Sequence, residues 1–285
     1  MNQYYLIGSP ISHSLSPTMM NFSFQMLGMD ARYDLCDTTV ETAAETVERF
    51  RREGVSGWNV TMPCKSVMQT LCDELSPAAR IGGAVNTVKN ENGRLIGHTT
   101  DGIGFMNAVS GKGVELRGKK MTLFGSGGAA AAILIQAALD GVSDIAVYCN
   151  RPESAKRTED LCAKLESVSD TSVKIRSYKD LSVMRKDLSE STALVNATNV
   201  GMAGGSRESA SLIPDVSYLS PDLFVYDIIY HPFCTPLLHL AKEAGCSCDN
   251  GLSMLIGQGA ESFRIWTGQN MPVSAVTEKL EAALS

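Results

Sequence analysis

Polar side chains that could bind a small molecule follow several segments that are typical of strands. Parallel sheets bind their ligands at the carboxyl ends of the strands, so side chains at these points can meet at one edge. Uncharged polar groups with one lysine and one aspartate suit a small, hydroxyl-rich, anionic substrate. The side chains in question are Asn59, Thr61, Lys65, Asn86, Thr87, Thr99, Thr100 and Asp101.

Two serines stand where the first helix is expected to begin. Ser14 and Ser16 precede Pro17, and proline is favoured at the first position of a helix. A plain N-cap needs only one hydroxyl, which Ser16 supplies. The second hydroxyl opens the alternative that the pair binds a carboxylate or a polyol.

A glycine-rich turn, Gly125-Ser126-Gly127-Gly128, lies between an expected strand at 119–124 and an alanine-rich expected helix at 129–139. Glycines there let the backbone approach a pyrophosphate, and the helix directs its first N–H groups at the phosphates. The turn departs from the spacing G-x-G-x-x-G, because Ala130 occupies the position of the third glycine. In its strand–turn–helix–strand context, the segment is interpreted as a dinucleotide-binding turn.

The end of the next expected strand, 144–149, bears on which dinucleotide binds. Folds that bind NAD usually place an acid here to hold the ribose hydroxyls. This chain has Asn150-Arg151, with Lys156 and Arg157 close behind. A guanidinium can hold a 2′-phosphate through two parallel hydrogen bonds, so these residues favour NADP. Glu153 adds an opposing charge.

Strand and helix signals alternate along the chain, which predicts an α/β fold with mainly parallel sheets covered by helices. In the first hundred residues we expect strands at 4–8, 31–36 and 57–60, helices at 16–27, 40–52 and 65–75, and a hairpin at 83–97. Further strands are expected at 223–226 and 246–249, and helices at 236–244 and from Leu252 onward. The glycine- and serine-rich stretch 201–211 predicts a loop.

Composition fits a soluble globular chain with two domains. The 285 residues are 44% hydrophobic, and 25 basic against 31 acidic residues give a net charge of −6, which argues against a nucleic-acid partner. No stretch is long and apolar enough to cross a bilayer, and the first residues do not resemble a signal peptide. The eight cysteines and four histidines form no zinc-ligand pattern. We therefore expect a cytoplasmic protein with reduced thiols, no metal and no membrane partner.

A series of motifs resembles, in order and over nearly the whole chain, those of the shikimate dehydrogenase family, including its quinate/shikimate dehydrogenase branch. In the first part of the chain these are H-S-L-S-P at 13–17, N-V-T-x-P-x-K at 59–65, G-A-x-N-T at 83–87 and T-D-G at 100–102. Later come G-x-G-G-A at 125–129, N-R at 150–151, N-x-T-x-x-G-M at 196–202, D-x-x-Y-x-P-x-x-T-x-L at 227–237 and G-x-x-M-L-x-x-Q at 251–258.

The resemblance implies a role for each matching residue. Lys65 and Asp101 would be the catalytic pair, and both would also contact the substrate. The other substrate-binding residues would be Ser14, Ser16, Thr61, Asn86, Tyr230 and Gln258. The cofactor-binding residues would be Gly125, Ser126, Gly127, Gly128, Ala129, Asn150, Arg151, Ile228 and Gly251.

The resemblance also implies a domain plan and a reaction. Residues 1–101, completed by helices in 252–285, would bind the substrate, and residues 102–251 would form a Rossmann-type domain for NAD(P). The reaction would be the reversible, NADP-dependent reduction of 3-dehydroshikimate to shikimate in aromatic amino-acid biosynthesis.

Two departures from the family pattern leave alternatives open. Thr99 stands where the family usually has asparagine, and Pro152 replaces a threonine whose hydroxyl binds phosphate. With Glu153 beside it, this change leaves NAD or dual cofactor use open, and with it a quinate/shikimate dehydrogenase. A folate dehydrogenase of similar architecture and a non-catalytic sensor of shikimate or NADP are more distant alternatives. The sequence does not decide between a monomer and a homodimer.

Overall fold

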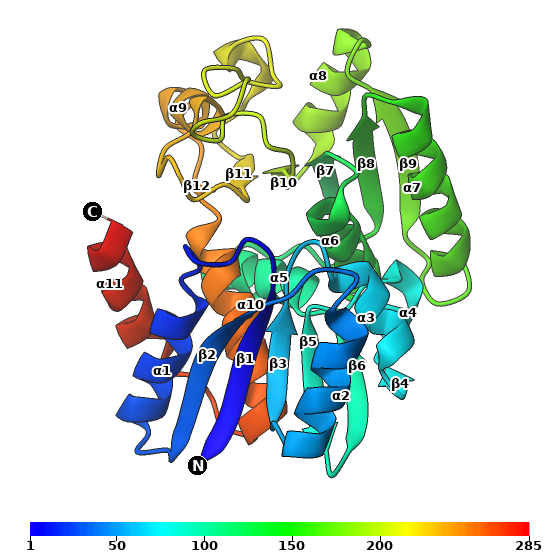
Figure 1. Ribbon diagram of the computed structural model, residues 1–285. Coiled ribbons are helices and arrows are strands. Elements are labelled where there is room, and N and C mark those ends of the chain that lie inside the picture. Colours follow the sequence, from blue (N-terminus) through cyan, green and yellow to red (C-terminus); the bar gives the residue numbers. More distant parts are fainter. Residues whose placement is uncertain (285) are drawn as a thin grey trace. The chain divides into compact units, whose positions relative to one another are not determined.

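The computed structural model describes residues 1–284, which form two compact units (Figure 1). The first comprises Met1–Gly104 and the residues from Ile256 onward, and the second comprises Phe105–Leu255. The expected divisions after residues 101 and 251 lie three and four residues from these bounds. Each unit has its own sheet with helices against it, so the α/β prediction is confirmed.

The sheet of the first unit has the strand order β2-β1-β3-β5-β6-β4. β1 (Asn2–Gly8) pairs in parallel with β2 (Ala31–Asp37) and with β3 (Gly57–Val60). The predicted hairpin is present as β5 (Thr87–Glu91) and β6 (Arg94–His98), the antiparallel part of the sheet. Its turn holds Asn92 and Gly93 at φ of 55° and 91°, conformations that asparagine and glycine tolerate best.

Helices of the first unit surround this sheet, and the largest differences from the expected bounds are at α3 (Lys65–Leu71) and α4 (Pro77–Gly82). The helices are α1 (Ser16–Met26), α2 (Ala43–Glu53), α3, α4, the start of α5 (Asp101–Gly111), most of α10 (Leu252–Thr267), and α11 (Val273–Leu284). α3 ends at Leu71 rather than Leu75, because Glu74–Leu75 forms a short strand, β4, paired with β6. The unexpected α4 begins after Ser76, whose hydroxyl caps it.

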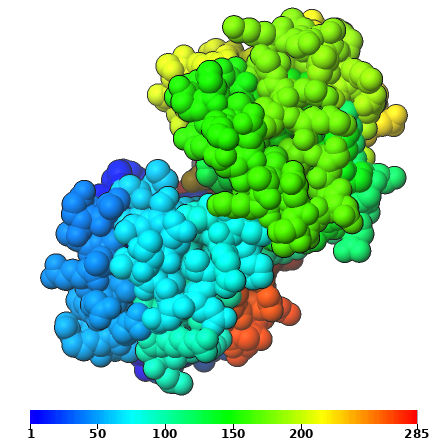
Figure 2. Space-filling model, turned by 90° about the vertical axis from the view of Figure 1, so that its right-hand side faces the viewer, coloured from blue at the N-terminus to red at the C-terminus, as the bar shows by residue number. Residues whose placement is uncertain are grey.

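Of the C-terminal helices, α10 packs on the first sheet, and α11 packs against α1. Trp266 of α10 donates its indole N–H to the carbonyl of Val88, at 2.9 Å, and its ring lies 4.9 Å from that of Tyr4. Figure 2 shows this part of the chain, in orange, on the surface beside the cyan residues of the first unit. The last segment of the chain therefore completes a core begun by the first.

The second unit holds a fully parallel sheet of order β12-β11-β10-β7-β8-β9. Its strands are β7 (Lys120–Phe124), β8 (Asp144–Cys149), β9 (Ser172–Ser177), β10 (Ala193–Asn196), β11 (Phe224–Asp227) and β12 (Cys248–Asp249). Its other helices are α6 (Gly128–Leu139), α7 (Pro152–Leu165), α8 (Leu181–Glu190) and α9 (Pro236–Glu243). The strand order reverses between β7 and β10, and α/β sheets bind ligands outside the carboxyl ends of strands at such a point.

Three observations concern the expected chemistry of the chain as a whole. All eight cysteines are free thiols. Within residues 1–284, no group of histidine, cysteine, aspartate or glutamate side chains is arranged to hold a metal ion. In the same range, no helix combines the length and apolar character needed to cross a membrane.

Candidate active site

Lys65 and Asp101 meet in the first unit, although they are 36 positions apart in the chain. Each is the first residue of a helix, α3 and α5. The Lys65 Nζ lies 2.5 Å from Asp101 Oδ2, and the two side chains are 27% and 17% exposed. Asn86 donates its Nδ2 to the other carboxylate oxygen at 2.9 Å. The ammonium group is therefore held in a partly open position from which it can reach a ligand.

The two serines of the first motif lie at the start of α1, but Ser16 is not its cap. Ser16 is the first helical residue and Leu15 occupies the cap position, because the Ser14 hydroxyl, two residues earlier, accepts the Ser16 backbone N–H at 3.2 Å. Ser16 is buried, and its side chain lies near the hydroxyl of Tyr33. Burial raises the pKa of Tyr33, so this phenol stays protonated.

Hydrogen bonds lead from Tyr33, near Ser16, to the lysine–aspartate pair. The Tyr33 hydroxyl donates to Asn59 Oδ1 at 2.8 Å, and Asn59 Nδ2 donates to Thr87 Oγ1 at 3.0 Å. Thr87 in turn donates to Asn86 at 3.1 Å, and Asn86 holds Asp101. The structure thus joins Tyr33 to Asp101 and Lys65 in one hydrogen-bonded network, and Ser16 lies near its Tyr33 end.

Thr61 and Gln258 lie in the same unit as this network. Thr61 follows β3, and its N–H donates to the carbonyl of Ile7 at 2.8 Å. Gln258 lies in the part of α10 that belongs to the first unit. The remaining predicted substrate residue, Tyr230, lies instead in the second unit, where it lines a pocket.

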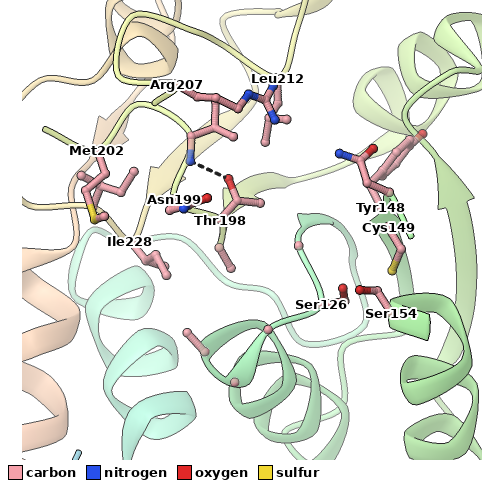
Figure 3. Close-up of a pocket in the computed structure, with 18 of the residues that line it drawn as sticks. Ser126, Tyr148, Cys149, Ser154, Thr198, Asn199, Met202, Arg207, Leu212 and Ile228 are labelled. Atoms are coloured by element: carbon pink, nitrogen blue, oxygen red, sulfur yellow. Dashed lines mark hydrogen bonds between the residues drawn. The ribbon is translucent and has the colours of Figure 1, made fainter. Parts of the chain in front are cut away.

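That pocket lies at the carboxyl ends of the strands in the second sheet and has a volume of about 770 Å³. It is lined by every residue of the predicted turn from Gly125 to Ala129, by Asn150 and Arg151, and by Ile228. Figure 3 shows the contributions of three separate segments: Ser126 from the turn, Ser154 from the start of α7, and Arg207 and Leu212 from the long loop after β10. The predicted cofactor residues are therefore brought together.

Two glycines of the predicted set are required by close approaches of the backbone. Gly125 has a φ of +112°, and a Cβ there would lie 2.6 Å from the carbonyl oxygen of Ala197. A Cβ on Gly251 would lie 1.8 Å from the carbonyl oxygen of Ile228. Gly251 does not line the pocket. It lies directly behind Ile228, which does line it. Only glycine allows the backbone segments to pack this closely.

The charge of the pocket is strongly one-sided. Within the described chain, its lining includes Arg151, Arg157 and Arg207 and no aspartate or glutamate. Glu153, which opposed an NADP assignment on sequence grounds, is exposed and outside the lining. Ser154 lies in the wall and accepts a 3.3 Å hydrogen bond from Arg157. A serine hydroxyl therefore stands in the pocket wall two residues after Pro152.

A buried carboxylate holds the loops on the far side of the pocket. Asp227, at the end of β11, is fully buried and accepts hydrogen bonds from Asn196 Nδ2, the Thr235 hydroxyl and the Ile229 N–H. Burial raises the pKa of Asp227 to about 6, although these three donors oppose the rise. The carboxylate ties together the ends of β10 and β11 and the start of α9. Its backbone donor, Ile229, lies between the two pocket residues Ile228 and Tyr230.

Several residues that the structure places in the network or in the pocket stand in none of the predicted motifs. Tyr33 and Ser262 belong to the polar network but stand in no motif, and Arg207 comes from a stretch that looked like a plain loop. Tyr178, after β9, also lines the pocket. None of these residues belongs to a motif, and a single arginine in an exposed loop is an ordinary surface residue, so the sequence carried no specific signal for them.

Comparison with known proteins shows the family of the chain. A family model described as "Shikimate dehydrogenase substrate binding domain" matches residues 6–88, and one described as "Shikimate 5'-dehydrogenase C-terminal domain" matches residues 251–281. A shikimate dehydrogenase (NADP(+)) of Listeria monocytogenes is 44% identical over 96% of this chain and 94% of its own length. The chain belongs to the shikimate dehydrogenase family.

Solved structures of family members agree with this fold. A shikimate 5-dehydrogenase from Listeria monocytogenes, in complex with shikimate and NAD, superposes with a TM-score of 0.95 at 43% identity, covering 98% of this chain and 96% of its own. An enzyme from Thermus thermophilus, in complex with NADP(H) and shikimate, has a TM-score of 0.84 at 33% identity, with both chains fully covered. The family expected from the motifs, with its Rossmann-type domain, is confirmed.

Proposed function

We propose that this protein is an NADP-dependent shikimate dehydrogenase, which reversibly reduces 3-dehydroshikimate to shikimate in aromatic amino-acid biosynthesis. The observation that carries the proposal is the hydrogen-bonded group of Lys65, Asp101 and Asn86 in a chain of this family. A protein that only sensed its ligand would need no lysine held at 2.5 Å from a carboxylate in a partly open site.

The residues of the first unit handle the proton of the reaction. When the substrate is reduced, its 3-keto oxygen gains a proton, and when shikimate is oxidised the hydroxyl loses one. Lys65 is the group that holds this proton and stabilises negative charge on the oxygen. Asp101 fixes the direction of the ammonium group, and Asn86 fixes Asp101. Ser14 and Ser16 offer hydroxyls for the substrate carboxylate.

The pocket of the second unit fits NADP. When bound, NADP supplies or accepts the hydride at the ring carbon that bears the 3-oxygen. Gly125 to Gly128 and the first N–H groups of α6 would hold the pyrophosphate. The three arginines and Ser154 would hold the 2′-phosphate of the adenosine, and Ile228 with Gly251 behind it would face the nicotinamide.

Four assays test the proposal directly. The purified chain is given shikimate or quinate with NADP or NAD, and kcat/KM is measured for each pair. We expect the highest value for shikimate with NADP, because the described residues give the pocket three guanidinium groups and no carboxylate, which favours the extra phosphate. A preference for quinate with NAD would instead establish the quinate/shikimate dehydrogenase alternative. No turnover with any pair would refute the enzymatic proposal.

The NAD alternative has one observation in its favour, since the similar Listeria structure contains NAD. Arg207 provides a test within this chain. Replacing Arg207 by alanine is expected to raise KM for NADP about tenfold and to leave KM for NAD within about twofold. A tenfold change corresponds to the loss of roughly one charge-assisted hydrogen bond to the 2′-phosphate.

The control for this variant is Arg185→Ala. Arg185 lies in the same unit and bonds Ser217, but it is outside the pocket. Its replacement should change KM for neither cofactor. If Arg207→Ala weakened NAD and NADP equally, Arg207 would contact the adenine or the pyrophosphate and not the 2′-phosphate.

We also propose that the protein acts in the cytoplasm. Its eight cysteines are all unpaired, which suits a reducing compartment, and the pathway proposed for it consumes soluble intermediates.

A further inference from the structure

A cluster of uncharged polar side chains lies behind the Lys65–Asp101 pair. Each of its members is 5% exposed or less. They come from β3, from the segments before and within β5, from the residue before α5, and from α10. The members are Asn59, Asn86, Thr87, Thr100 and Ser262. Buried polar groups are stable only when they have hydrogen-bond partners, and here the partners are one another. Removing one member therefore affects the hydrogen bonds of the others.

The hydroxyl of Thr87 is the centre of this cluster. Its Oγ1 lies 2.8 Å from Ser262 Oγ, 3.0 Å from Asn59 Nδ2 and 3.1 Å from Asn86 Oδ1. Thr100 Oγ1 is a more distant fourth neighbour at 3.4 Å. In the described part of the chain, no other hydroxyl reaches the side-chain amides of both asparagines.

The donor and acceptor of most hydrogen bonds in the cluster follow from the chemistry of the amide groups. An amide nitrogen can only donate and an amide oxygen can only accept. Thr87 therefore accepts a hydrogen bond from Asn59 Nδ2, and in its contact with Asn86 Oδ1 Thr87 is the donor. In its contact with Ser262 either hydroxyl can be the donor. The Thr100 N–H also donates to that oxygen, at 2.8 Å. With its oxygen held in this way, Asn86 can only present its NH₂ group to Asp101.

We propose that Thr87 is a positioning residue for the reaction: its hydroxyl locks the Asn86 amide in the orientation that holds Asp101 and, through it, Lys65. The proposal rests on the proposed function. Without this hydroxyl, Asn86 keeps only the Thr100 contacts on its oxygen and its amide gains freedom to turn. Among the described residues, Thr87 has no hydrogen bond to Asp101 or Lys65, so its effect passes through Asn86, its shortest link to the pair.

The experiment compares two substitutions of similar size. Thr87→Val keeps the shape of the side chain and removes the hydroxyl, whereas Thr87→Ser keeps the hydroxyl and removes the methyl group. We expect Thr87→Val to lower kcat for shikimate oxidation by about 10- to 100-fold, because small displacements of catalytic groups cost this much. KM for shikimate should change by less than about threefold, because the substrate-binding hydroxyls remain. Thr87→Ser should keep kcat within about threefold of the parent chain.

A matched control separates this effect from the loss of any buried hydroxyl. Thr122 is an equally buried threonine in β7 of the other sheet, with a 2.9 Å contact to Ser191. Thr122→Val should leave kcat unchanged, and the melting temperatures of all variants show whether they fold.

Two results would overturn the proposal while leaving the proposed function intact. One is a folded Thr87→Val variant with the kcat of an active parent chain. The other is an equal loss in Thr87→Ser, which would assign the effect to packing of the methyl group. A parent chain with no activity would refute the proposed function and this proposal together.

Discussion

Replacing Lys65 by alanine is expected to lower kcat for shikimate oxidation by about a thousandfold, in the range found for removal of a general acid–base group. Lys65 lies 2.5 Å from Asp101 and no other cation in the described chain is bonded to that carboxylate. The proton of the substrate oxygen then has no acceptor held in place. KM for shikimate should change much less, since Ser14, Ser16 and Asn86 stay in position. Steady-state kinetics with NADP in excess measures both values.

A second lysine of the same unit serves as the control. Lys89 is 31% exposed, close to the 27% of Lys65, and also pairs with a carboxylate, Glu91, at 2.6 Å. Lys89→Ala should leave kcat unchanged, because this pair belongs to the hairpin and not to the site. If Lys65→Ala raised KM and kept kcat, Lys65 would bind substrate without transferring a proton.

Replacing Gly251 by alanine is expected to destabilise the second unit and to weaken cofactor binding severely. The added Cβ would lie 1.8 Å from the carbonyl oxygen of Ile228, far inside van der Waals contact, and backbone cannot give way as a flexible side chain does. We expect a loss of at least about 3 kcal/mol in the free energy of unfolding, the upper part of the range for overpacking. The segment carrying Ile228 must shift, so KM for NADP should rise in whatever protein remains folded.

Denaturant unfolding and cofactor titration test this variant beside Gly111→Ala. Gly111 ends α5, and a Cβ there meets nothing within 4 Å. That substitution should be neutral or slightly stabilising. A Gly251→Ala chain with parental stability and parental KM for NADP would show that the Ile228 segment does not need this close approach.

Local features of the chain were predictable because their causes are local. The hairpin at β5 and β6 follows from Asn92-Gly93, and the dinucleotide turn follows from glycines placed between a strand and a helix. Helix ends were less predictable where tertiary pairing decides. α3 ends early because β4 finds a partner in β6, where Glu74 pairs with the distant Ile96, and that pairing has no signature in the segment itself.

The division between units was also only approximate in the sequence. Linkers between domains usually show as flexible, polar stretches. Here both bounds fall inside helices, between residues 104 and 105 of α5 and between residues 255 and 256 of α10. A helix that continues across a boundary carries no composition change, so the contacts alone define the units.

The sequence by itself determined the family, the types of side chain available for chemistry, and the position of each at the end of a strand or the start of a helix. The tertiary structure decided which of them act together. Asn59 and Ser262, 203 residues apart, share a hydrogen bond, and Arg207 of a loop without regular structure reaches the same pocket as Arg151. These groupings depend on packing between segments remote in the chain. No local pattern encodes such distances, because only folding brings the segments together.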